Sequence, residues 1–65
     1  MEITDLKNGQ FIMDSNGGVF RVSVSGAYIT FFKQGLVYSF TLDELSYPLE
    51  VFEEGKSIGK IEARF

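Results

Sequence analysis

The chain has 65 residues, a formal net charge of −3, and neither cysteine nor histidine. This length accommodates one domain, and the missing residue types exclude disulfides, thiolate or imidazole metal sites, and the usual catalytic triads. The negative charge also disfavours nucleic acid as a partner, because nucleic-acid binders neutralise phosphates with clustered Lys and Arg. We therefore expect one non-catalytic domain (residues 1–65) that is not an enzyme and holds no metal and no cofactor.

The negative charge lies in the last third of the chain. Residues 1–42 contain three acidic and three basic residues, whereas residues 43–65 contain six acidic and three basic residues. This distribution suits contact with a basic protein surface better than contact with nucleic acid. No apolar run has the length of a signal peptide core or a membrane-spanning helix, so we expect a cytoplasmic protein without membrane contact.

Residues 1–9 are expected to lead into a β-sheet. Ile3 and Leu6 are spaced to contact a sheet edge, and Asn8-Gly9 is typical of a turn that starts the first strand.

From residue 10 to residue 42 the sequence predicts four short β-strands joined by tight turns at Asn16-Gly17, Ser25-Gly26 and Gln34-Gly35. Asn-Gly is the strongest short hairpin signal, since a type I′ turn requires positive φ at both central residues. At the third turn, a four-residue loop would place the same side chains on the same faces as a two-residue turn.

Each turn also predicts which residues lie opposite one another, and opposite residues share a face of the sheet. The three predicted registers agree on one apolar side that faces the core. Its expected cross-strand rows are Met13/Phe20/Phe31/Tyr38, Phe11/Val22/Ile29/Phe40 and Val24/Ala27/Leu42.

A single helical turn is predicted after these four strands. Thr41 to Glu44 has the S/T-x-x-E form of a capping box, and Pro48 prevents a longer helix. We expect the turn to span Leu42 to Leu45, with both leucines under the sheet.

Two further strands are predicted near the C-terminus. The first spans residues 49–52, and residues 53–56 form the turn after it. The second spans residues 60–65, where polar and apolar residues alternate, and Gly59 marks a bulge before it. Its expected inward residues are Ile61, Ala63 and Phe65.

The order of elements between residues 10 and 52 resembles that of the SH3-like small barrels. The residues that carry the resemblance are the strands of 19–41, the helical turn of 42–45 and the strand after Pro48. It implies an all-β fold, either a small antiparallel barrel or a strongly bent sheet. The paired aromatic motif of the SH3 peptide groove is missing, so the resemblance does not imply binding of proline-rich peptides. In size and style the chain is also similar to short proteins of bacteriophages and prophages, which often act on a host protein.

The outward face of the predicted sheet carries an apolar row that a solvated face would not need. Val19, Phe32 and Val37 fall in this row, with Ile12 diagonal to them, and Phe32 is the expected anchor. Arg21 and Tyr28 share the face and are amphipathic, as interface residues often are. The predicted contact surface is therefore Ile12, Val19, Arg21, Tyr28, Phe32 and Val37. An equally weighted alternative is that the N-terminal or C-terminal segment covers the row.

These observations favour a non-catalytic protein-binding module, including the hypothesis of a phage-encoded modulator or inhibitor of a host protein. Self-association is also expected, because burial and chain ordering nearly cancel in a domain this small and no disulfide assists it. The alternatives are binding of single-stranded nucleic acid or a nucleotide through Arg21, Tyr28 and Phe32, or a homo-oligomer that holds a small ligand between subunits.

Overall fold

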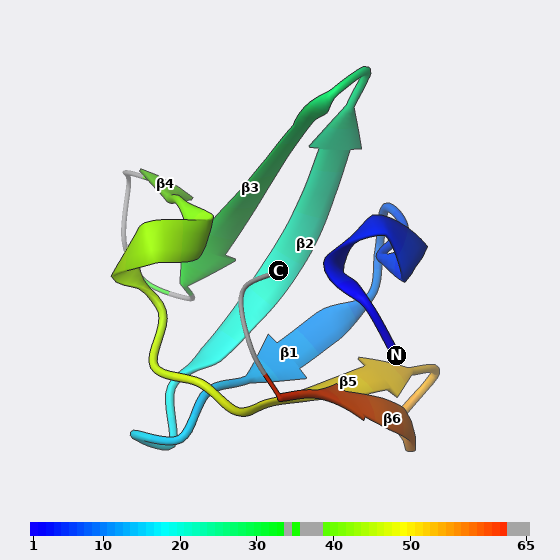
Figure 1. The fold of residues 1–65 in the computed structure, drawn as a ribbon, viewed down its shortest axis with the longest axis vertical. Coiled ribbons are helices and arrows are strands. Elements are labelled where there is room, and N and C mark those ends of the chain that lie inside the picture. The colour runs from blue at the N-terminus through cyan, green and yellow to red at the C-terminus, as the bar shows by residue number, and fades with distance from the viewer. Residues whose placement is uncertain (34, 36–38, 63–65) are drawn as a thin grey trace.

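Six antiparallel strands form one open sheet in the computed structural model of the chain, which describes residues 1–33, 35 and 39–62 (Figure 1). The order of strands across the sheet is β4-β3-β2-β1-β5-β6. The all-β class predicted from the sequence is thereby confirmed. The strands are β1 (Phe11–Met13), β2 (Val19–Ser25), β3 (Tyr28–Lys33), β4 (Ser39–Phe40), β5 (Leu49–Glu53) and β6 (Lys56–Ile61).

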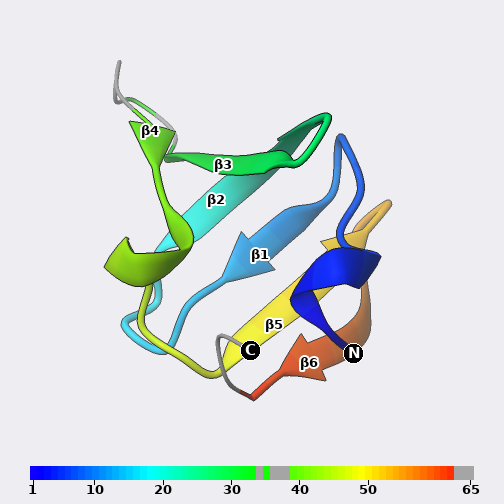
Figure 2. The same ribbon diagram turned by 45° about the horizontal axis from the view of Figure 1, so that its top comes forward.

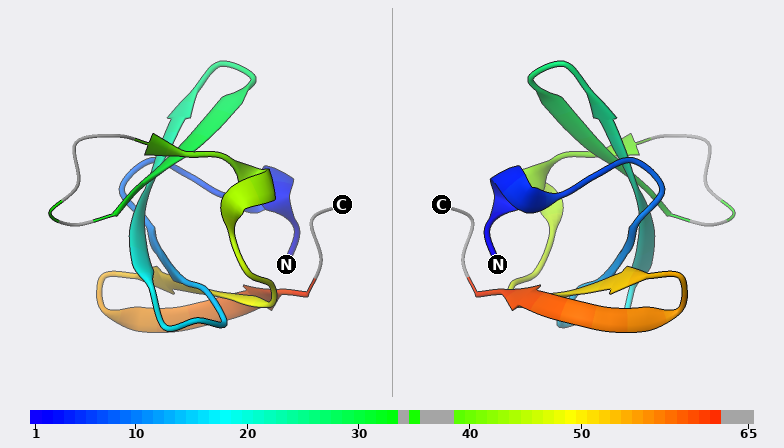
Figure 3. Two further views of the ribbon diagram at one scale, coloured as in Figure 1. Left: turned by 90° about the vertical axis from the view of Figure 1, so that its left-hand side faces the viewer. Right: turned by 90° about the vertical axis from the view of Figure 1, so that its right-hand side faces the viewer.

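Two short 3₁₀ turns, η1 (Ile3–Asp5) and η2 (Leu42–Glu44), lie on the same side of the sheet (Figure 2). The sheet curls around this side, which is therefore its concave face (Figure 3). The opposite, convex face is the outer face of the molecule.

The core lies between the concave face and the two turns. Strand side chains alternate between the two faces, and in β2 the buried residues Phe20 and Val22 alternate with the exposed residues Val19 and Arg21. The buried apolar residues are Leu6, Ile12, Phe20, Val22, Phe31, Leu45, Leu49, Val51 and Ile61, and Ile3, Val24, Ile29, Phe40, Leu42 and Tyr47 are half-buried against them.

The helical turn predicted after the first four strands is confirmed. Thr41 caps η2, and Glu44 Oε1 accepts hydrogen bonds from the backbone N–H of Thr41 at 3.0 Å and from its hydroxyl at 3.1 Å. Leu45 is buried and Leu42 is half-buried against the core, as expected. Strand β5 then follows Pro48, also as expected.

The β5–β6 hairpin has the turn that the sequence predicts. Glu54 and Gly55 both have positive φ, at 51° and 80°, as a type I′ turn requires. Strand β6 begins at Lys56, earlier than predicted. Ile61 is buried, as expected, whereas the predicted inward positions Ala63 and Phe65 lie outside the described residues.

A β-bulge interrupts the pairing of β5 with β6. Val51 lies opposite Gly59 and Phe52 lies opposite Ser57, so Ile58 is the extra residue. The bulge predicted at Gly59 is therefore present, with the residue before Gly59 as the inserted one.

The β2–β3 hairpin has the predicted faces but not the predicted register. Val22 lies opposite Phe31 and Val24 opposite Ile29, so the predicted pairing of Val22 with Ile29 is wrong. The turn is Gly26-Ala27, which leaves Ala27 exposed instead of core-facing. Because side chains alternate with a period of two, a shift of two residues keeps each side chain on its predicted face.

The β3–β4 register differs from the prediction in the same way. Phe31 lies opposite Phe40 and Phe32 opposite Ser39, two residues from the predicted pairs. A shift of two residues is the shift that the four-residue loop considered for the third turn would give. Tyr38, predicted to lie opposite Phe31, is outside the described residues.

Strand β1 faces the opposite way from the prediction. Ile12 lies opposite Phe20 and is fully buried, so the prediction that it faces outward is wrong. Phe11 and Met13, which were expected in the core, are instead 44% and 37% exposed. A register shift of one residue moves every side chain of a strand to the other face, and this shift exchanges Ile12 with its two neighbours.

The shift arises because five residues, 14–18, separate β1 from β2 instead of a two-residue turn. Asp14 holds this loop: its Oδ1 accepts hydrogen bonds from the backbone N–H groups of Asn16 at 3.2 Å and Gly18 at 2.9 Å. The N–H of Asp14 also donates to the carbonyl oxygen of Gly18 at 2.9 Å. Because side chains alternate between the two faces, a loop with an odd number of residues turns each side chain of β1 to the face opposite the one that a loop with an even number would give.

The segment before β5 fixes the same loop from outside. The backbone N–H of Ser15 donates to the carbonyl oxygen of Ser46 at 2.9 Å, and the side-chain amide of Asn16 donates to the hydroxyl of Ser46 at 2.7 Å. The loop conformation therefore depends on a residue 30 positions away in the sequence.

We predict that Ile12→Ala lowers the free energy of unfolding by about 2–5 kcal/mol, because it removes a fully buried side chain from the core. Met13→Ala, at the next position but on the outer face, should lower it by less than about 1 kcal/mol. Urea unfolding followed by circular dichroism measures both values. Equal losses for the two variants would contradict the observed register of β1.

We predict that Asp14→Ala lowers the free energy of unfolding by about 1–3 kcal/mol, because two backbone N–H groups lose their acceptor. Ser15→Ala is the matched control, since its hydroxyl makes no hydrogen bond to any described residue. Its effect should stay within about 0.5 kcal/mol. If the two variants unfold at the same urea concentration, Asp14 does not hold the loop.

Candidate functional site

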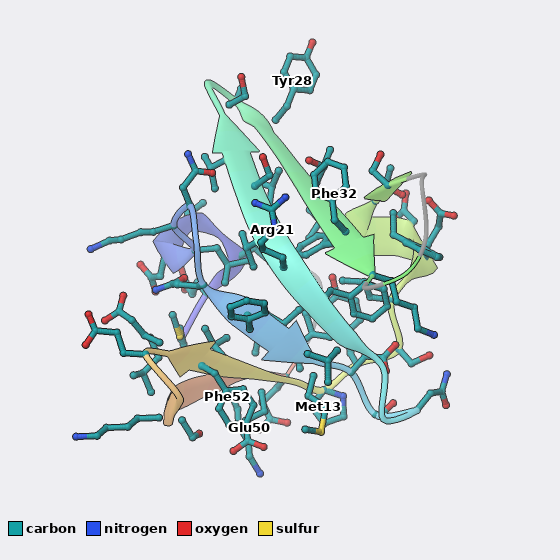
Figure 4. The ribbon with its side chains drawn as sticks, turned by 180° about the vertical axis from the view of Figure 1, so that it is seen from behind. Met13, Arg21, Tyr28, Phe32, Glu50 and Phe52 are labelled. Carbon is teal, nitrogen blue, oxygen red and sulfur yellow. The ribbon has the colours of Figure 1, made fainter. Side chains whose placement is uncertain are left out.

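An aromatic row crosses four strands on the outer face of the sheet. We define it as Phe52 of β5, Phe11 of β1, Arg21 of β2 and Phe32 of β3, and each lies opposite the next in the strand pairing. Arg21 and Phe32 point toward the viewer in Figure 4. Phe11 is exposed, whereas Phe32 and Phe52 are half-buried. Cross-strand neighbours on one face are close enough for their side chains to contact one another.

A second row runs beside the aromatic row. Met13 of β1 lies opposite Glu50 of β5 on one side and Val19 of β2 on the other. Val19 is 46% exposed. Together the two rows form what we call the outer patch: Phe11, Met13, Val19, Arg21, Phe32, Glu50 and Phe52.

The two charges of the outer patch have different environments. The guanidinium carbon of Arg21 lies 5.4 Å from the centre of the Phe32 ring, which is within the range of a cation–π interaction. Glu50 Oε2 accepts a hydrogen bond from the Ser57 hydroxyl at 2.7 Å. Arg21 and Glu50 lie on opposite sides of β1, which pairs with both of their strands.

Four of the six residues predicted for the contact surface are exposed or half-buried on the outer face. Val19, Arg21 and Phe32 belong to the outer patch, but Phe32 lies opposite Arg21, so Val19 and Phe32 do not share a row as predicted. Tyr28 is on the same face at the far tip of the β2–β3 hairpin and is 78% exposed (Figure 4).

The other two predicted residues do not contribute to the described surface. Ile12 is in the core, for the reason given above. Val37 lies outside the described residues.

Sequence reasoning missed three apolar residues of the outer patch and its acidic residue. Phe11 and Met13 were assigned to the core because the first loop was given an even length. Phe52 and Glu50 alternate with Leu49 and Val51, which are both buried. The period-two pattern of this strand could have placed Phe52 and Glu50 outward.

The N-terminal segment does not cover the outer patch. Leu6 is buried in the core and Ile3 is half-buried against it, and η1 lies on the concave side (Figure 2). The side-chain oxygen of Asn8 accepts a hydrogen bond from the backbone N–H of Val24, which ties the segment to β2. The alternative in which this segment covers the apolar row is therefore wrong.

The outer patch is suited to non-covalent contact. Aromatic residues, Met and Arg are the residue types enriched at protein interfaces, and Met adapts readily to the shape of a partner. Within the described residues, no three Asp, Glu, His or Cys side chains are grouped so that they could hold a metal ion. The described part of the chain also contains no helix with the length and hydropathy needed to cross a membrane.

Comparisons with protein-family models, curated proteins and solved structures give no match to this chain.

We predict that Arg21 and Phe32 are energetically coupled. We consider a double-mutant cycle with Arg21→Ala and Phe32→Leu. The two changes in the free energy of unfolding should be coupled by about 0.5–1 kcal/mol, as for an exposed cation–π pair. Tyr28→Leu serves as the control, because Tyr28 lies at the far tip of the hairpin (Figure 4). The change that Tyr28→Leu causes in the free energy of unfolding should simply add to the change that Arg21→Ala causes. Additive effects in the Phe32 cycle would show that the ring contributes nothing to the position of Arg21.

Proposed function

We propose that this chain is a non-catalytic protein-binding module and that the outer patch is its contact surface. The observation that carries the proposal is the exposed Phe11, Met13 and Val19 at the centre of one sheet face. Soluble monomers rarely expose large contiguous apolar patches, and such patches commonly mark interaction sites. A solvated sheet face would instead carry polar residues at these positions.

The charges of the molecule support a protein partner. The outer patch contains one cation and one anion, so it carries no net charge, although the whole chain carries −3. Interface centres are depleted in charged residues, whereas nucleic-acid surfaces need several cations. A compact module of this kind suits a modulator that acts by occupying the surface of another protein, such as a host protein in the case of a phage-encoded chain.

The order of the elements bears on the fold and not on the function. A meander, one helical turn and a strand after Pro48 follow one another as in the SH3-like barrels that the sequence resembles. The described sheet is open, so the resemblance concerns the order of the elements and not closure of a barrel.

One observation favours a second candidate function. Three phenylalanines in a row beside Arg21 form a platform on which unpaired bases could stack. The two functions differ in their response to salt, because nucleic-acid binding weakens steeply as salt concentration rises.

We predict that Phe11→Thr/Met13→Thr abolishes partner binding and leaves the fold intact. Both positions are exposed, and threonine retains a preference for β-strands. Immobilised wild type and variant are compared by the proteins that each retains from a host-cell lysate. A matched control is Thr4→Ala, an exposed residue of η1 on the other side of the sheet.

A protein that the wild type and the control retain, and that the double variant loses, would support the proposal. The same proteins bound by all three chains would contradict it. Binding of a single-stranded oligonucleotide that disappears at high salt would favour the second candidate function.

A further inference from the structure

Arg21 is an exposed cation to which the described part of the chain supplies no carboxylate. Its guanidinium carbon lies 5.4 Å from the centre of the Phe32 ring. Its neighbours across the sheet are Phe11 and Phe32, and its neighbours on the same face of β2 are Val19 and Ser23. None of these neighbours is charged. The aromatic row therefore holds the guanidinium in place and leaves its charge without an acidic neighbour.

The other charged residues on this side of the sheet are distant from Arg21. Glu50 on β5 is two strands from β2, and Lys60 on β6 is three strands from it. Glu50 and Lys60 lie opposite each other, so each offsets the charge of the other. Glu62 follows the end of β6, at the same far edge. Adjacent strands are about 4.8 Å apart, so Glu50 starts about 10 Å from Arg21, where physiological salt screens most of their attraction.

We propose that Arg21 binds the carboxylate of an Asp or Glu side chain of the protein partner, and that apolar residues beside this carboxylate cover Phe11 and Met13. This inference rests on the proposed function and names the chemistry of the partner at the same surface. A guanidinium has paired N–H donors whose spacing matches the two oxygens of a carboxylate. Stacking over the Phe32 ring leaves these donors free at the edge of the guanidinium.

The shape of the outer face favours a short acidic segment of the partner. The outer face is convex (Figure 3), so a flat surface cannot contact all of its strands at once. Phe11, Arg21 and Phe32 lie in one row on three adjacent strands, which a short segment can cover. Met13 and Val19 lie in the next row. An acidic residue flanked by apolar residues matches this arrangement of one cation among apolar side chains.

This partner differs from the basic surface that the net charge of the chain favours. Other acidic residues of the last third of the chain lie away from Arg21. Glu44 belongs to η2 on the concave side, Glu53 accepts a hydrogen bond from Gln10, and Glu54 is in the β5–β6 turn. Exposed charges more than about 8 Å apart are largely screened at physiological ionic strength. The charge that a partner meets at the aromatic row is therefore that of Arg21.

The test begins with a library of random-sequence peptides, from which immobilised wild type selects its ligands. The selected peptides should contain an Asp or Glu beside an aromatic or aliphatic residue. Replacing that residue with Asn or Gln removes one charge and keeps the shape, so it should weaken binding to wild type by about three- to tenfold. Isothermal titration calorimetry measures both affinities. This comparison changes only the peptide, so it does not depend on the folding of a variant.

Variants of the chain then identify the cation. Arg21→Gln should weaken binding of the acidic peptide by a similar factor, and it should bind the acidic and amide peptides equally, because the contact is already lost. Lys60→Gln is the matched control: it removes the same charge from an exposed site on the same face and should bind like wild type. Arg21→Lys keeps the charge without the paired donors and should be intermediate. Thermal unfolding shows whether each variant is folded.

Several results would overturn the inference. These are a failure to select any peptide, selected peptides without an acidic residue, equal affinities of the acidic and amide peptides for wild type, or full binding by Arg21→Gln. If a single-stranded oligothymidylate binds through Arg21 and acidic peptides do not, Arg21 serves the second candidate function and the inference is also wrong. Failure here is distinct from failure of the proposed function. Peptides that require Phe11 and Met13 but not Arg21 would retain that function and overturn only this inference.

Discussion

The hydrogen bonds of Asp14 determine which side chains this protein presents to its surroundings. The Asp14 carboxylate accepts hydrogen bonds from the backbone N–H groups of Asn16 and Gly18. These bonds hold a loop with an odd number of residues between β1 and β2. That parity places Ile12 in the core and its two neighbours outside. The same alternation along β1 thus completes the core and creates the apolar centre of the outer patch. A loop with an even number of residues would place Phe11 and Met13 in the core and Ile12 on the outer face.

The sequence predicted the elements of the fold whose signals are local. The capping box from Thr41 to Glu44, the strand after Pro48 and the bulge near Gly59 all depend on residues close together in the chain, and all are present. The faces of β2 and β3 were also predicted, because each has enough residues to show a period of two. Their register was not, since a shift of two residues leaves the apolar pattern unchanged.

The facing of β1 could not be read in this way. The strand has three residues, all apolar, so it shows no alternation. Its direction is decided by the loop conformation, which also involves the distant Ser46. The same limit applies to the site. Val19, Arg21 and Phe32 were placed on the outer face from β2 and β3, whereas Phe11 and Met13 were lost with the register of β1.

The bulge in β6 has a consequence for how copies of this chain can assemble. An edge strand with regular, unpaired backbone groups can recruit another strand, and repeated addition leads to fibrils. In β6 the extra residue Ile58 interrupts that regular spacing, and Lys56 and Lys60 place positive charges along the edge. Neighbouring molecules are therefore discouraged from extending the sheet at this edge.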